Sequence, residues 1–164
     1  MRCANPPWFY RAVNQAGLFC KYWVPVGMWM LLIFGASSDT LSSAHTSRII
    51  GPIIRWLTPN ISEGALGSLV FRVRKCAHVT EYAVLAWLFW RARRKPVTAD
   101  LRPWCWSEFW IALGLVTLYG ASDEFHQLFV QTRVASVWDV LIDACGGALG
   151  LMLLWSFGRW RKQW

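Results

Sequence analysis

Apolar residues gather in four stretches of the chain, at positions 23–38, 76–90, 109–130 and 134–155. At a rise of about 1.5 Å per residue, a helix of about 22 residues crosses the ~30 Å hydrocarbon core of a bilayer, and the last two stretches have this length. The first two are shorter and need flanking residues to complete a span. The pattern therefore predicts an all-α membrane protein with four transmembrane helices.

A soluble helical bundle is the alternative to a membrane protein. The chain is 55 % hydrophobic and contains 13 tryptophans, which makes it more apolar than a typical soluble domain. Many of the tryptophans stand near the ends of the apolar stretches, where indole rings are typical of a membrane–water interface. Both features favour the membrane protein.

The one long connection covers residues 39–75. Its apolar part, "RIIGPIIRWL", is interrupted by Gly51 and Pro52 and is too short to span a bilayer. We therefore expect a long outer loop that contains an interfacial or re-entrant segment. Ser62 followed by Glu63 is typical of a helix start and predicts a helix that leads into the second stretch.

The net charge of +8 reflects membrane topology in this interpretation, and no nucleic-acid partner is expected. Three Lys or Arg precede the first span, five lie in the connection after the second and three follow the fourth, so 11 of the 17 fall on one side. The positive-inside rule then places both termini in the cytoplasm. The predicted location is the bacterial inner membrane.

One membrane domain accounts for nearly the whole chain. Residues 1–22 are predicted to be a cytoplasmic lead, residues 23–158 the four-helix domain and residues 159–164 a cytoplasmic tail. The first apolar stretch is interpreted as an uncleaved span, because no convincing cleavage site follows it. The five cysteines form no C-x-x-C pair, so neither a disulfide framework nor a structural zinc site is expected.

Polar side chains of all four predicted helices gather in the outer half of the bundle. Residues 119–147 alone hold four of the nine acids. Glu81, Asp123 and Asp143 each lie seven residues from the outer end of their helix, which puts them about 10 Å deep in one layer. Charged groups at that depth must pair or line a wet cavity. The layer predicts either an outward-facing polar pocket or a buried network that only holds the helices together.

Two imidazoles and three carboxylates are the candidates for chemistry: His78, Glu81, Asp123, Glu124 and His126. At one level on neighbouring helices, such groups suit a proton relay, a divalent-metal site or general acid/base catalysis. A divalent metal is therefore one possible cofactor. The residues expected to bind a ligand around them are Arg74, Lys75, Tyr82, Gln127, Arg133, Ser136, Asp139 and Asp143.

Several of these residues also have a structural interpretation. Residues 136–139 fit an S-x-x-D capping box, so Asp139 serves equally well as a helix cap. Small residues in a span more often permit close helix packing than bind ligands, and this applies to Gly146, Gly147 and Gly150. The basic residues at the outer helix ends mark the membrane boundary as readily as they bind an anion.

Three segments resemble VanZ-like proteins: "GASSDTLSS", "RKCAHVTEYAVLAWL" and "YGASDEFHQLFVQTRVASVWDVLIDACGGALG". That family typically shows an Arg-Lys-x-x-His-x-x-Glu-Tyr block, an Asp-Glu-x-His-Gln block that ends in an Arg-x-x-Ser-x-x-Asp turn, and a Gly-rich last helix. The resemblance covers residues 30–155. Two departures are visible: residues 130–132 stand where a Pro-Gly turn is usual, and Asp143 stands where an Asn is common.

The resemblance implies a small integral membrane protein, and the namesake of the family is associated with resistance to teicoplanin, a lipoglycopeptide antibiotic. Carried over position by position, the motif residues are Arg74, Lys75, His78, Glu81, Tyr82, Asp123, Glu124, His126, Gln127, Arg133, Ser136 and Asp139.

Two functions are expected from the residues and the resemblance together. In the first, the pocket binds or modifies an amphipathic envelope molecule, such as a lipid, a lipid-linked precursor or a lipoglycopeptide. The chain is then a membrane-embedded hydrolase or transferase if chemistry occurs. Either His126 with Asp123 or His78 with Glu81 supplies the acid/base pair. In the second, it is a non-enzymatic binding or resistance protein, or a purely structural one. A proton-coupled carrier is disfavoured, because four short helices leave little room for alternating access.

The predicted topology is testable by cysteine accessibility in a variant that lacks the natural cysteines. An impermeant thiol reagent added to intact cells is expected to label Ser43→Cys, in the outer connection, and to leave Thr98→Cys unlabelled until the cells are permeabilised. The reverse pattern, with Thr98→Cys labelled in intact cells, contradicts the orientation.

Overall fold

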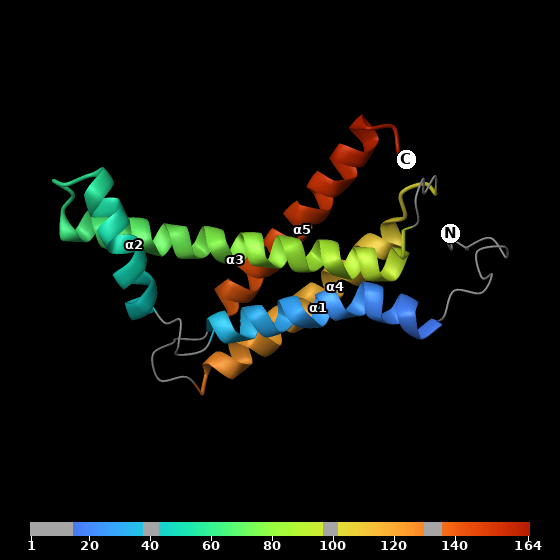
Figure 1. The fold of residues 1–164 in the computed structure, drawn as a ribbon, viewed down its shortest axis with the longest axis horizontal. Helices are drawn as coiled ribbons and strands as arrows, with labels where there is room; N and C mark the ends of the chain where they lie inside the picture. The colour runs from blue at the N-terminus through green and yellow to red at the C-terminus, as the bar shows by residue number, and fades with distance from the viewer. Residues whose placement is uncertain (1–14, 38–42, 97–101, 130–135) are drawn as a thin grey trace.

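The computed structural model describes residues 15–37, 43–96, 102–129 and 136–164, and this part of the chain is all-α. The helices, in chain order, are α1 (Gln15–Ser37), α2 (Ser43–Leu57), α3 (Glu63–Arg94), α4 (Trp106–Gln127) and α5 (Val137–Trp160). Helices α1, α3 and α4 lie beside one another, α5 crosses them obliquely, and α2 packs beside the first turns of α3 (Figure 1). The expected helical fold is confirmed.

Helix α3 is the centre of the bundle, because it packs against every other helix. Its middle turns bury Tyr82, Leu85 and Ala86 completely, and they meet Val116 of α4 and Leu151 of α5 in one hydrophobic core. Lipid tails are as apolar as these side chains, so a close fit between the helices contributes more to their association in a membrane than burial alone.

The contact between α3 and α5 is close enough to exclude side chains. A Cβ atom built on Gly146 lies 2.7 Å from the carbonyl oxygen of Val79, and one built on Gly150 lies 2.7 Å from that of Ala83. Two glycines four residues apart therefore let the two backbones touch, as small-xxx-small motifs do in membranes. The packing role expected for these glycines is confirmed.

The long connection is mostly helical, which corrects the expected outer loop. Helix α2 runs through Gly51 and Pro52, although both residues predict an interruption. Ile54 of α2 is buried against Leu66 and Val70 of α3. Packing against α3 thus overrides the weak local propensity of the Gly-Pro pair.

The start of α3 agrees with the sequence prediction. Ser62 caps the helix, and its side chain accepts a hydrogen bond from the Ala65 amide at 3.3 Å. From Glu63 the helix continues for 32 residues, about 48 Å at 1.5 Å per residue, which exceeds the ~30 Å of a bilayer core. The first turns of α3, together with α2, therefore extend beyond the other helices.

Two of the helices are long and apolar enough to cross a membrane, over Gly17–Ser37 and Val137–Trp160. Helices α3 and α4 are also long enough, but charged residues reduce their apolarity. In α4 these are Glu108, Asp123 and Glu124.

Tryptophans and a buried arginine occupy one end of the bundle, which we call the tryptophan end. The Arg94 guanidinium, only 2 % exposed, donates to the Pro103 carbonyl at 3.1 Å and to Glu108 at 3.2 Å. It lies 5.4 Å from the ring of Trp90 and 5.5 Å from that of Trp164. These contacts tie the end of α3 to the start of α4.

The cysteines differ in part from the expectation. Cys105 at the tryptophan end is disulfide-bonded, whereas the sequence predicts no disulfide framework. Cys20, Cys76 and Cys145 are free.

The glycine contact predicts a specific loss of stability. We expect Gly146→Ala to lower the free energy of unfolding by about 1–3 kcal/mol, because the added methyl group overpacks a backbone contact. Gly114→Ala is the control, since a Cβ atom there meets nothing within 4 Å; it should be neutral or slightly stabilising. Thermal unfolding in detergent measures both, and equal midpoints for the two variants would contradict the packing role.

Candidate functional site

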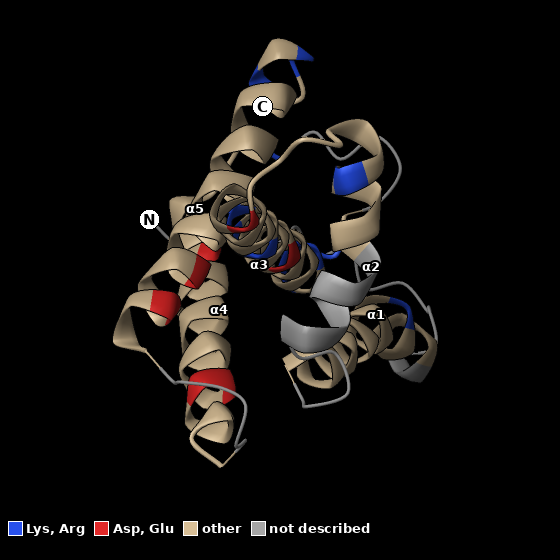
Figure 2. Cartoon of the chain, turned by 90° about the vertical axis from the view of Figure 1, so that its left-hand side faces the viewer, with Lys and Arg blue, Asp and Glu red and all other residues tan. Residues whose placement is uncertain are grey.

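Polar side chains from four helices meet at the end of the bundle opposite the tryptophans. Figure 2 looks onto this end and shows acidic residues of α4 and α5 on neighbouring turns. We call this group the polar cluster; its members are Ser37, Lys75, His78, Tyr82, Asp123, Glu124, Gln127, Ser136, Asp139 and Asp143.

Two contacts between a basic and an acidic side chain connect α3 to α5. The Lys75 ammonium lies 2.5 Å from Asp139, and His78 Nδ1 lies 3.7 Å from Asp143 Oδ1. Asp139 and Asp143 are one helical turn apart, as are Lys75 and His78, so the two pairs form successive rungs. The Lys75–Asp139 rung is about a quarter exposed, whereas the Asp143 side chain is only 2 % exposed. The Lys75–Asp139 contact thus lies near the protein surface, and the His78–Asp143 contact lies one helical turn deeper in the bundle.

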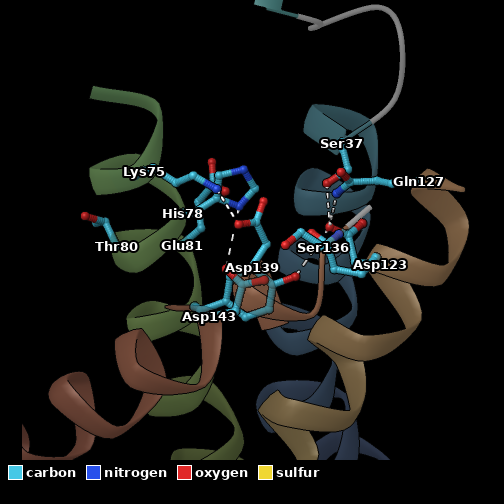
Figure 3. A network of polar contacts seen from close by, with 12 residues as sticks. Ser37, Lys75, His78, Thr80, Glu81, Asp123, Gln127, Ser136, Asp139 and Asp143 are labelled. Atoms are coloured by element: carbon cyan, nitrogen blue, oxygen red, sulfur yellow. Dashed lines mark hydrogen bonds and ion pairs between the residues drawn. The ribbon is translucent and has the colours of Figure 1, made fainter. Parts of the chain in front are cut away.

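Asp123 holds the end of α1 against α4. Its Oδ2 atom accepts a hydrogen bond from Ser37 Oγ at 2.7 Å and from Gln127 Nε2 at 3.0 Å, and the Tyr82 hydroxyl lies 3.5 Å away. Ser37, Asp123 and Gln127 are all buried. In Figure 3, Ser37 and Gln127 surround Asp123, while Lys75 and His78 face Asp139 and Asp143.

Tyr82 links the two halves of the polar cluster. Its ring is fully buried, and a Cβ atom built on Gly120 lies 3.3 Å from the ring and 3.5 Å from Asp143. A side chain at position 120 would therefore press on both groups. Gly120 leaves the space in which the tyrosine approaches the two acids.

In the described part of the chain, each of the two most buried carboxylates keeps one oxygen without a hydrogen-bond partner. These atoms are Oδ1 of Asp123 and Oδ2 of Asp143. Most buried polar atoms in proteins are paired, so an unpaired carboxylate oxygen is costly. Such oxygens are suited to accept a proton or a hydrogen bond from a ligand.

The start of α5 is capped by residues of two helices. Ser136 Oγ accepts from the Trp138 amide at 3.2 Å, so Ser136 caps the helix, although the predicted capping box would use the Asp139 amide. However, the carboxylate that accepts from the Ser136 amide, at 2.8 Å, is Glu124 of α4. Asp139 instead pairs with Lys75. The carboxylate that the capping box assigns to Asp139 is therefore supplied by Glu124, from across the interface between α4 and α5.

The remaining candidates have other positions. His126 packs its ring against Phe34 of α1, with 4.4 Å between ring centroids. Arg74 and Glu81 are half-buried on α3, and the Glu81 carbonyl accepts from Trp29 Nε1 at 2.9 Å. Arg133 lies outside the described residues. The structure thus pairs His78 with Asp143. The sequence predicted different acid/base pairs, namely His78 with Glu81 or His126 with Asp123.

Sequence reasoning also omitted Ser37 from the site. Two signals were available, its place as a polar residue at the end of an apolar stretch and its presence in the segment "GASSDTLSS", but neither reveals that it faces Asp123. As for metals, the described part of the chain contains no group of three or more His, Cys, Asp or Glu arranged to hold an ion.

Comparison with known families confirms the resemblance seen in the sequence. The family model described as VanZ/LLP1 matches residues 22–158, a range that contains every member of the polar cluster. Comparison with curated proteins and with solved structures gives no significant match.

The geometry around Asp123 predicts the effect of losing one donor. Ser37→Ala leaves the buried carboxylate with fewer partners, so we expect a loss of about 1–3 kcal/mol in stability. Ser122→Ala is the matched control, because the exposed Ser122 hydroxyl only donates to the Tyr119 carbonyl within its own helix. Thermal unfolding in detergent compares them; a Ser37→Ala midpoint equal to that of the control would contradict the bond's contribution.

Proposed function

The chain belongs to the VanZ/LLP1 family, and from this premise we propose that its polar cluster forms an outward-facing pocket for an amphipathic molecule of the bacterial cell envelope. Family membership and the two apolar helices support membrane character. The proposed protein has four spans, α1, α3, α4 and α5, with both termini in the cytoplasm of the inner membrane.

The distribution of charge and aromatic rings supports this orientation. The tryptophan end carries most of the described basic residues, namely Lys21, Arg91, Arg93, Arg94, Lys95, Arg102, Arg159, Arg161 and Lys162. Such an excess is typical of the cytoplasmic side, and tryptophans are typical of the interface. The polar cluster then faces outward, and α2 lies at the outer surface with Ile53, Trp56 and Leu57 exposed to lipid head groups.

The observation that carries the proposal is the pair of unpaired, buried carboxylate oxygens on Asp123 and Asp143. A network whose only role is to hold helices together gains stability by satisfying each of its buried polar atoms. Here two carboxylates, Asp123 and Asp143, are buried away from water. One oxygen of each accepts no hydrogen bond in the described part of the chain. This favours a site prepared for a proton or for a donor group on a ligand.

The Lys75–Asp139 rung suits recognition of a head group at the mouth of the pocket. Both side chains are partly exposed, so an anionic head group competes with Asp139 for the ammonium through charge-assisted bonds. Arg74, half-buried one residue away, adds positive charge. Deeper in the pocket, His78 and Asp143 are the pair we assign to proton transfer if the protein is a hydrolase or transferase.

Binding without chemistry is the second candidate function. It is favoured by the number of cluster residues that also join helices, through the Ser37–Asp123 and Lys75–Asp139 contacts. A resistance protein that sequesters a lipid-linked molecule or a lipoglycopeptide needs only such a pocket.

Charge-changing variants separate a functional site from a scaffold. Asp123→Asn and His78→Gln, both in the polar cluster, roughly conserve size and polarity, and we expect each to insert and to unfold within a few degrees of the wild type. In a deletion strain, they should fail to restore the lipid and cell-wall-precursor profile that the wild-type chain restores. Thr80→Val, whose side chain points away from the cluster in Figure 3, serves as the control.

Two outcomes would count against this proposal. Loss of stability in parallel with loss of the envelope profile indicates a structural network. Full complementation by both variants indicates that the cluster has no role in the phenotype.

A further inference from the structure

A pocket of about 590 Å³ lies between α2 and the start of α3. The exposed, charged side chains of Arg55 and Glu63 line it together with the buried side chains of Leu66 and Val70. None of the described residues that line the pocket belongs to the polar cluster, so it is a separate feature of the molecule.

Two glycines leave the pocket open. A Cβ atom built on Gly51 of α2 or on Gly67 of α3 meets nothing within 4 Å, and both residues line the pocket. A larger side chain would therefore fit at either position without a clash, at the expense of the pocket volume. The contact that joins the two helices, Ile54 against Leu66 and Val70, requires neither glycine.

The length of α3 places this pocket at the level of lipid head groups in the proposed orientation. For a helix along the bilayer normal, the ~30 Å hydrocarbon core takes up about 20 residues. Counted back from Arg91 at the tryptophan end, the core ends close to Val70. Glu63 is seven residues earlier and lies about 10 Å further out, in the head-group layer. Trp56, 80 % exposed on α2, is typical of a side chain in that layer.

The two charges in the pocket are available to a ligand. The Arg55 guanidinium and the Glu63 carboxylate are 2.6 Å apart, and their side chains are 54 % and 81 % exposed. Exposed ion pairs contribute little to stability, so this pair can open readily. The contact uses one of the five N–H donors of the guanidinium and one of the two carboxylate oxygens. A cation and an anion side by side complement a ligand in which an anion and a cation are also neighbours.

Phosphoethanolamine has this arrangement of charges, because two carbon atoms join its phosphate to a primary ammonium. The phosphate accepts charge-assisted hydrogen bonds from Arg55, and the ammonium donates to Glu63. A choline head group lacks the N–H donors, and a phosphatidylglycerol head group has a negative charge and no cation to offer the carboxylate. Deeper in the pocket, Leu66 and Val70 provide an apolar surface for the first methylene groups of an acyl chain.

We infer that the α2–α3 pocket binds one phosphatidylethanolamine molecule of the outer leaflet. Its phosphate lies on Arg55, its ammonium on Glu63 and the start of one acyl chain on Leu66 and Val70. This site goes beyond the proposed function, since the polar cluster contributes nothing to it. It makes α2 a lipid-binding helix that holds the outer end of α3 in the head-group layer.

Native mass spectrometry of the purified full chain in detergent tests this assignment. The protein is titrated in turn with phosphatidylethanolamine, phosphatidylcholine and phosphatidylglycerol that carry identical acyl chains. We expect the apparent affinity for phosphatidylethanolamine to be about fivefold higher than for either of the others, which corresponds to roughly one exposed charge-assisted contact. Equal affinities for the three lipids would overturn the inference.

Three variants locate the binding site. Glu63→Gln removes the partner of the ammonium, and we expect it to abolish the preference for phosphatidylethanolamine over phosphatidylcholine. Gly67→Leu fills the pocket and should lower the affinity for phosphatidylethanolamine about fivefold or more. Gly64→Leu is the matched control, because Gly64 is an exposed glycine about one turn earlier on α3 that does not line the pocket. Thermal unfolding verifies that all three are folded. Wild-type lipid binding by Glu63→Gln or by Gly67→Leu contradicts the site.

A variant of the polar cluster separates this inference from the proposed function. Asp123→Asn is expected to bind phosphatidylethanolamine as the wild type does. Loss of that binding in Asp123→Asn, together with its retention in Gly67→Leu, would place the lipid at the polar cluster and overturn the inference. Restoration of the envelope profile by Asp123→Asn contradicts the proposed function and leaves the α2–α3 site in place.

Discussion

The backbone contact between α3 and α5 determines the geometry of everything at the polar end of the bundle. Gly146 and Gly150 allow the two helices to approach until a Cβ atom would lie 2.7 Å from the facing carbonyls. One turn nearer the start of α5, the same approach brings Asp143 to His78 and Asp139 to Lys75. Wider helix separation would leave these carboxylates without their basic partners, so packing of the smallest residues positions the most polar ones.

A membrane makes such a cluster expensive, and the structure shows how the cost is distributed. Charges pair across α3 and α5, Asp123 takes donors from α1 and α4, and Glu124 caps the first turn of α5. Ionised groups within a bilayer persist when they pair or line a cavity. In the proposed function, the oxygens left unpaired on Asp123 and Asp143 are therefore the atoms at which stability and function are most directly opposed.

The two ends of the bundle have different chemistry and complementary roles. At the tryptophan end, Arg94 is enclosed by carbonyls, Glu108 and indole rings, an arrangement that fixes the connection between α3 and α4. At the polar end, charge is partly exposed and partly unsatisfied.

Much of the fold could be predicted from the sequence because local signals are strong in a membrane-like chain. Apolar stretches located four of the five helices, Ser62 and Ser136 marked helix starts, and the outer-half acids marked the polar end. Helix α2 was missed because Gly51 and Pro52 weaken helix propensity, and only burial of Ile54 against α3 overcomes that weakness.

The sequence by itself therefore determined which residue types lie at which end of each helix, since helical rise and side-chain hydrophobicity are local properties. It could not determine their partners. That His78 meets Asp143, that Glu124 completes the cap of Ser136, and that His126 packs on Phe34 depend on the rotation and crossing of whole helices. Those are set by the fit of glycines against a facing backbone, an interaction between residues far apart in the chain that only the tertiary structure specifies.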